Sequence, residues 1–99
     1  MMSNDLKLPE RLDTASARQL AGALARLRGQ PVGLDGGAVV FGGALGLQVL
    51  VAASRQWRDD CQPFRVAPVS DGLQGACRTL GIDPQEIGAG DPIETEEEA

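Results

Sequence analysis

With 99 residues, the chain has the length of one small domain and is too short for two. It contains no histidine, and Cys61 and Cys77 are not part of a CxxC motif, so catalysis and a metal site are both disfavoured. The net charge of −5 comes from the C-terminal end, because residues 83–99 hold seven acids and no base, whereas residues 1–82 hold seven acids and nine bases.

The composition also bears on partners and location. No basic stripe with interleaved aromatic residues is present, which argues against nucleic-acid binding. No apolar run approaches the roughly 20 residues that cross a bilayer, and the polar N-terminal stretch does not resemble a secretory signal. We therefore expect a cytoplasmic protein without direct membrane insertion, with free thiols and without a cofactor.

The N-terminal third predicts a strand, a helix and a second strand. Residues 6–9, LKLP, alternate weakly and end at a proline, which favours a short edge strand. A helix is predicted over residues 14–28, with Asp13 or Thr14 as its N-cap and leucines at helical spacing. The short apolar run PVGLD at residues 31–35 indicates a buried parallel strand.

Two further helices and one strand are predicted in the second half. A strongly apolar helix is expected over residues 44–60, and Trp57 on its stripe is expected to be partly buried rather than a binding anchor. Residues 63–67, PFRVA, predict another strand. A third helix is predicted over residues 70–80, with Ser70 as its N-cap.

This alternation predicts an α/β fold, a small mixed sheet of about four strands with three or more helices, over residues 1–83. Cys77 lies on the apolar face of the third helix and is expected in the core. Residues 84–99 are acidic and offer little apolar surface to bury, so we predict a disordered tail.

Three motifs occur in a recognisable order. ERLDTASARQL at residues 10–20 leads into the first helix, LDGGAVVFGGALGLQVL at residues 34–50 forms a turn and an apolar helix, and PVSDGLQGACRTLGID at residues 68–83 closes the domain. Together they resemble the STAS domain, which anti-sigma-factor antagonists share with the cytoplasmic domains of sulfate transporters. The resemblance covers roughly residues 6–83 and implies the STAS fold and a non-enzymatic role exerted by binding another protein.

The STAS signature is altered at its regulatory position. The family's aspartate falls on Gly43, and the serine that its kinases phosphorylate falls on Ala44, which has no hydroxyl. The next small polar residue falls on Leu45, while the following glycine is retained as Gly46. The resemblance therefore implies a partner-switching-like regulator that is not controlled by phosphorylation at this serine. The helix sequence GLQVLVAA is similar to short, non-phosphorylatable STAS proteins found among chemotaxis genes of alphaproteobacteria.

The glycine-rich segment at residues 35–46 is the candidate site. A phosphate-binding loop would need a Walker or tight GxGxxG pattern, which is absent, although backbone amides at a helix start can attract an anion. A hinge explains the glycines but not the bulky residues between them, and a plain strand-to-helix connection remains an alternative. We favour a docking surface where small residues let another backbone approach. The expected partner-binding residues are Gly42, Gly43, Ala44, Leu45, Gly46 and Gln48.

Three classes of function follow from these features. The leading one is a signalling adaptor that binds a kinase-like or chemotaxis-pathway protein through the helix beginning at Ala44. An accessory subunit of a lipid or ion transporter and a nucleotide-binding sensor are the alternatives. The sequence does not indicate an oligomeric state.

Overall fold

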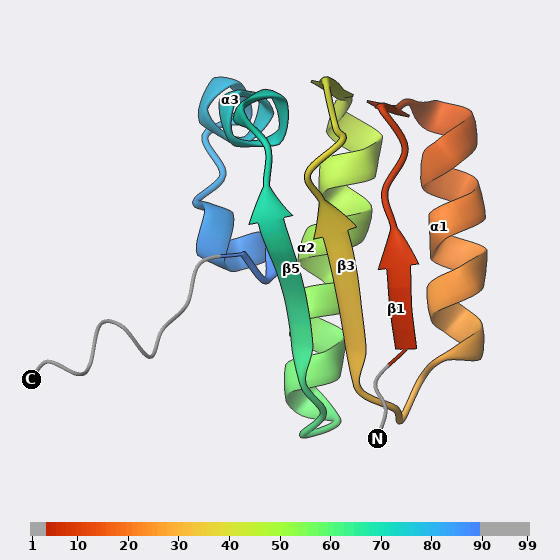
Figure 1. Ribbon diagram of the computed structural model, residues 1–99. Coiled ribbons are helices and arrows are strands. Elements are labelled where there is room, and N and C mark those ends of the chain that lie inside the picture. The colour runs from red at the N-terminus through yellow and green to blue at the C-terminus, as the bar shows by residue number, and fades with distance from the viewer. Residues whose placement is uncertain (1–3, 90–99) are drawn as a thin grey trace, which may run out of the picture.

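The computed structural model describes residues 4–89, in which strands and helices alternate along the chain. Three strands form one parallel sheet in the order β1-β3-β5 (Figure 1). They are β1 (Asn4–Lys7), β3 (Val32–Gly36) and β5 (Phe64–Val69). Two shorter strands, β2 (Arg11–Leu12) and β4 (Phe41–Gly42), form a second parallel pair. The chain is therefore a small α/β fold with two sheets.

The α/β class is confirmed, but the expectation of one mixed sheet of about four strands is wrong. All pairings among residues 4–89 are parallel, and the strands divide between two sheets. The physical reason is the shortness of β2 and β4, which hold two residues each directly before α1 and α2. Two residues cannot show the alternation by which a strand is recognised. The edge position expected for the first strand is confirmed for β1.

The three predicted helices are confirmed. They are α1 (Thr14–Arg26), α2 (Ala44–Asp59) and α3 (Asp71–Leu80). Asp13 caps α1, because its carboxylate accepts a hydrogen bond from the Ser16 amide at 3.0 Å. Ser70 caps α3 in the same way through the Leu73 amide at 3.0 Å. No helix within residues 4–89 combines the length and apolar character needed to cross a membrane.

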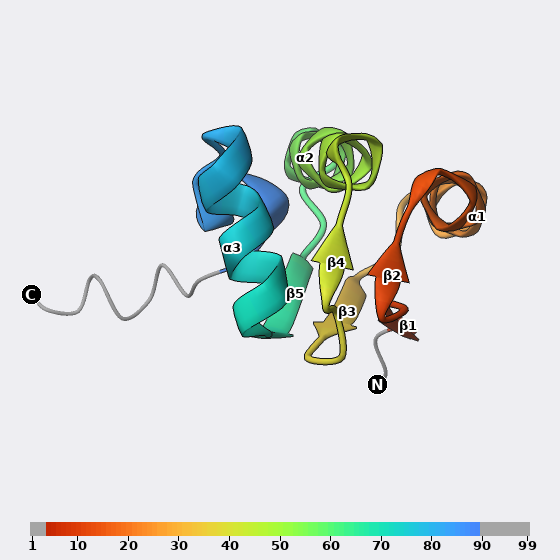
Figure 2. The same cartoon turned by 90° about the horizontal axis from the view of Figure 1, so that it is seen from above.

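Helices α1 and α2 cover the same face of the three-stranded sheet, and α3 lies beside β5 (Figure 2). The buried side chains of Val32, Leu34 and Val66 point toward this helical layer and join one apolar core. On β3 the alternate residues Gly33 and Asp35 are only half-buried. This alternation shows that one face of the sheet carries the core.

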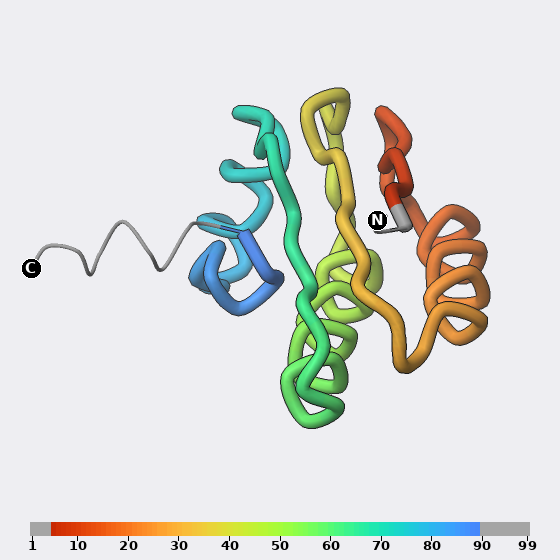
Figure 3. The backbone as a smooth tube through the Cα atoms, turned by 60° about the horizontal axis from the view of Figure 1, so that its bottom comes forward, coloured from red at the N-terminus to blue at the C-terminus, as the bar shows by residue number. Residues whose placement is uncertain are grey.

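The predicted domain boundary at residue 83 is too early. Pro84–Ile87 form a 3₁₀ turn, η1, and Ile87 is fully buried. Ala89 then pairs with Val66 of β5, and the Val66 amide donates to the Gly88 carbonyl at 2.9 Å. The blue segment beside β5 in Figure 3 is this extension of the body. The predicted disorder of the remaining tail, residues 90–99, lies outside the described residues.

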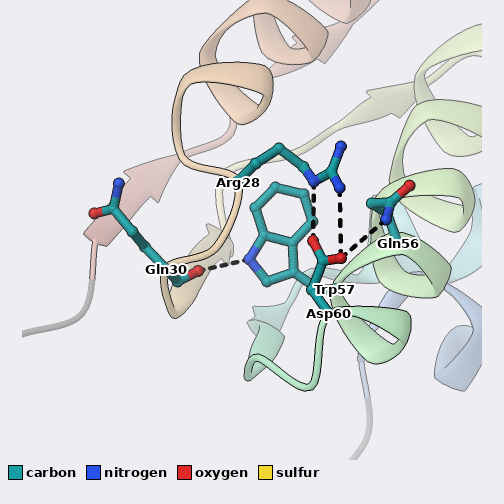
Figure 4. A network of polar contacts seen from close by, with 5 residues as sticks. All are labelled: Arg28, Gln30, Gln56, Trp57 and Asp60. Carbon is teal, nitrogen blue, oxygen red and sulfur yellow. Dashed lines mark hydrogen bonds and ion pairs between the residues drawn. The ribbon is translucent and has the colours of Figure 1, made fainter.

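Cys77 is buried, as expected for a core residue, and Trp57 is more deeply buried than the partial burial that was predicted. The Trp57 side chain is 2% exposed, and its Nε1 donates a 2.7 Å hydrogen bond to the Gln30 carbonyl (Figure 4). Its ring centroid lies 5.6 Å from that of Phe64. Trp57 therefore connects the end of α2 to the loop before β3 and to β5.

Near Trp57, an ion pair joins the segment after α1 to the end of α2. The Arg28 Nε donates to the Asp60 carboxylate at 2.9 Å, and Gln56 donates to the same carboxylate at 3.2 Å (Figure 4). The hydrogen bond from Arg28 is the main reason that the pKa of Asp60 lies below its ordinary value. The folded chain therefore binds this proton more weakly than the unfolded chain does.

Asp60→Asn should lower the melting temperature at pH 7, because the variant loses the carboxylate that pairs with Arg28. A depressed pKa contributes stability that is present above the unfolded pKa of about 3.9 and is lost as the pH falls through the folded pKa. Thermal melts at neutral pH and below about pH 3 should thus show the difference from wild type shrinking on acidification. Asp59→Asn, at the exposed neighbouring position, is the control. A difference independent of pH would contradict this assignment.

Candidate functional site

A groove of about 420 Å³ lies between two walls at one end of the fold. One wall is β4 with the start of α2, and the other is α3; Figure 2 shows these elements side by side. The groove is lined by Val40, Phe41, Gly42, Gly43, Ala44, Gly72, Ala76, Thr79 and Leu80. It is the place in the described chain where the glycine-rich segment meets the third helix.

The first wall is held in place by β2. The Val40 and Phe41 amides both donate to the Glu10 carbonyl, at 2.8 and 3.0 Å. The Gly43 amide donates to the Leu12 carbonyl at 3.0 Å, directly before α2 begins at Ala44. These bonds fix the direction in which the chain leaves β4 and enters α2, so the groove has a rigid side.

The second wall approaches closely because its contact residues are small. A Cβ at Gly72 would lie 2.6 Å from the carbonyl oxygens of both Val39 and Val40. A Cβ at Gly42 would lie 3.2 Å from that of Ala76. Helix α3 and strand β4 therefore run alongside one another, with Gly72 beside Val40 and Ala76 beside Gly42. Their small residues form the floor of the groove.

Exposed apolar side chains gather at this groove. The large hydrophobic residues that residues 4–89 expose are Val40 (71%), Phe41 (43%), Leu45 (40%) and Leu80 (42%). Three of them line the groove, and Leu45 follows the lining residue Ala44. An exposed apolar cluster of this kind around a concavity marks an interaction site. Elsewhere the large aliphatic and aromatic side chains of the described chain are buried or half-buried.

One guanidinium group lies beside the groove on the side of the first wall. The lining itself has no ionisable side chain, but the Arg11 guanidinium lies 4.7 Å from the centroid of the Phe41 ring. The α2 N-cap, Gly43, provides no side-chain hydrogen bond, and the first turn of α2 contains no acid. The partial positive charge at this helix start is therefore not balanced by the helix's own residues.

The structure brings together part of the predicted partner-binding set. Gly42, Gly43 and Ala44 line the groove, and Leu45 is exposed beside it. Gln48 is exposed one turn further along α2 and does not line the groove.

Gly46 does not belong to this surface, which corrects its place in the predicted set. It is buried, and a Cβ there would lie 2.6 Å from the Leu12 Cγ. Its small size thus serves the packing of α2 against β2.

The second wall and the exposure of Val40 and Phe41 were not predicted from the sequence. The missed residues of α3 are Gly72, Ala76, Thr79 and Leu80. One signal was available, since Gly72 and Ala76 are small residues four positions apart and lie on one helix face. Exposure of Val40 could not be found in this way, because a run of apolar residues does not show which of them faces solvent.

The side chains that line the groove are apolar except for that of Thr79. Thr79 provides the lining's one side-chain hydroxyl, and no group of three possible metal ligands occurs within residues 4–89. Burial raises the pKa of the Cys77 thiol in the core, and Cys61 is exposed beyond the far end of α2. The arrangement provides an apolar groove with the Arg11 guanidinium beside it.

Comparisons of the chain with models of known protein families, with curated proteins and with solved structures give no match.

Proposed function

We propose that this chain is a non-enzymatic regulatory protein that acts by binding a protein partner in the groove between β4 and α3. The observation that carries the proposal is the exposure of Val40, Phe41 and Leu80 around one concavity. Burying such side chains against a partner removes apolar surface from water, which is the main driving force of protein association. The side chains that line the groove are apolar except for the Thr79 hydroxyl, so the groove suits the apolar side chains of a protein better than a nucleotide.

The resemblance to STAS domains supports the same location. The position where that family has its phosphorylated serine is Ala44, which is exposed at the first residue of α2 and lines the groove. We infer a partner-switching-like mode of action in which the partner covers this helix start. Because alanine cannot accept a phosphoryl group, the control of binding in this chain does not act through phosphorylation at residue 44.

Val40→Glu tests the proposal. The side chain is 71% exposed, so the variant should fold with nearly unchanged stability, whereas a carboxylate facing the partner's apolar surface should abolish capture. Ala52→Glu adds the same charge at an exposed position of α2 outside the groove lining and is the matched control.

The measurement is a pull-down from the native cells with three baits, wild type, Val40→Glu and Ala52→Glu, after their melting temperatures have been compared. Quantitative mass spectrometry should find a protein retained by wild type and Ala52→Glu and lost with Val40→Glu. Its identity would separate a signalling protein from a transporter subunit. Equal retention by all three baits would place the docking surface elsewhere.

A further inference from the structure

We propose that the segment entering this groove carries a carboxylate close to an apolar side chain. The inference rests on the proposed docking function and adds the chemistry of the partner. It follows from the positions of the apolar walls and of the nearest positive charges.

The apolar component is set by the shape of the groove. Its floor is made of small residues, and Val40, Phe41 and Leu80 stand around it. Because Ala76 of α3 already lies close to Gly42 of β4, there is no space for a third strand beside β4. The partner therefore cannot pair with the free edge of β4, and it inserts a side chain into the groove instead. An aliphatic or aromatic side chain fits this environment.

The first positive group at the groove is Arg11. It is exposed, and its guanidinium lies over the ring of Phe41, which is itself part of the lining. The ion pair found within residues 4–89 joins Arg28 to Asp60, and Arg11 takes part in no ion pair in this part of the chain. The nearby Asp13 carboxylate accepts a hydrogen bond from the Ser16 amide at the start of α1, and it also attracts the Arg11 guanidinium from beyond ion-pair distance. The guanidinium therefore keeps donors that a partner's carboxylate can accept.

The start of α2 adds to this charge and gives the groove a direction. Ala44 lines the groove where α2 begins, without a side-chain cap and without an acid in the first turn. At the other end, Gly72 of α3 lies beside Val40, and the preceding residue is the acidic Asp71. A partner's carboxylate is attracted to the Ala44 end and repelled from the Asp71 end. The apolar side chain then lies between them.

A peptide display experiment tests this inference. A random peptide library is selected on immobilised full-length wild type, and the enriched peptides are measured by fluorescence polarisation. We expect them to combine an apolar residue with a neighbouring aspartate or glutamate. Replacing that acid by its amide in the peptide should weaken binding at least about tenfold, and added salt should weaken the parent peptide more than the amide version.

Two protein variants separate charge from size at the helix start. Ala44→Glu supplies a competing carboxylate at the proposed position and should weaken binding strongly, whereas Ala44→Gln has nearly the same volume and should weaken it much less. Arg11→Gln should reduce the preference for acidic peptides. The effects of Ala44→Glu and Arg11→Gln follow from charge, so both should diminish as the salt concentration rises.

The outcomes distinguish this inference from the docking function. Peptides that lose binding to Val40→Glu but bind equally well after acid-to-amide replacement would overturn the inference and leave the docking function in place. If no peptide distinguishes wild type from Val40→Glu, the docking function itself fails. A third outcome is that groove-dependent peptides are selected only by a variant of the 99-residue chain with Glu94, Glu96, Glu97 and Glu98 changed to glutamine. That result would make the chain's own acidic segment the occupant and would overturn an external acidic partner.

Discussion

Trp57→Ala should lower the free energy of unfolding by about 3–5 kcal/mol, a large part of the stability of a domain of this size. The indole is 2% exposed, so its removal leaves a cavity between α2 and the sheet. The variant also loses the hydrogen bond to the Gln30 carbonyl and the ring contact with Phe64. Equilibrium denaturation in urea, followed by circular dichroism, measures the loss.

Trp57→Phe is the matched control, because it keeps an aromatic ring in the core and removes the Nε1 donor. Its destabilisation should be clearly smaller than that of the alanine variant. Trp57 is the single tryptophan of the chain, so its fluorescence reports this site directly. Emission of the folded wild type at the wavelength of fully hydrated indole would contradict the burial and would favour a binding anchor instead.

The helices could be predicted from the sequence because each is specified locally. Ser70 and Asp13 cap α3 and α1, as the positions of hydroxyl and carboxylate side chains predicted. The αL conformation of Gly81, with φ of 71°, ends α3, and Ile82 packs back against the core. Such signals lie within a few residues of the element that they define. The burial of Trp57 followed from the same helical periodicity.

The division into two sheets and the end of the body could not be predicted because they depend on distant pairings. Strand β4 exists because amides within it and on either side of it, those of Val40, Phe41 and Gly43, donate to the Glu10 and Leu12 carbonyls about thirty positions earlier in the sequence. Residues 84–89 appeared to belong to the acidic tail. Glu86 is the acid among them, and it forms a capping box with Asp83, the residue directly before this segment, while the neighbouring Ile87 is buried. Local composition does not distinguish a capping acid from a solvated one.

The sequence marks one wall of the groove but not the other. Gly42, Gly43 and Ala44 could be singled out because they belong to a cluster of small residues directly before an apolar helix. The α3 wall could not, since its place opposite β4 results from tertiary packing. Gly46 was assigned to the docking surface because it is a small residue of the same segment. It is instead buried against Leu12 and belongs to the core packing.

Gly72→Ala should destabilise the fold, whereas Gly75→Ala, three residues later in the same helix, should stabilise it. A Cβ at Gly72 would lie 2.6 Å from two backbone carbonyl oxygens, so α3 must move away from β4 at a cost of about 1–3 kcal/mol. A Cβ at Gly75 meets no atom within 4 Å. Alanine there gains about 0.5–1 kcal/mol from reduced freedom of the unfolded chain and better helix propensity.

The pair also tests how the groove is formed, because both variants add one methyl group to α3 and only one of them adds it at the floor. Gly72→Ala should widen the distance between α3 and β4 and weaken any groove-bound peptide, while Gly75→Ala should leave peptide affinity unchanged. Thermal melts and the polarisation titration on the same samples measure both effects. Equal stability changes in the two variants would mean that α3 does not pack against the Val39 and Val40 carbonyls, and the groove would then lose its second wall.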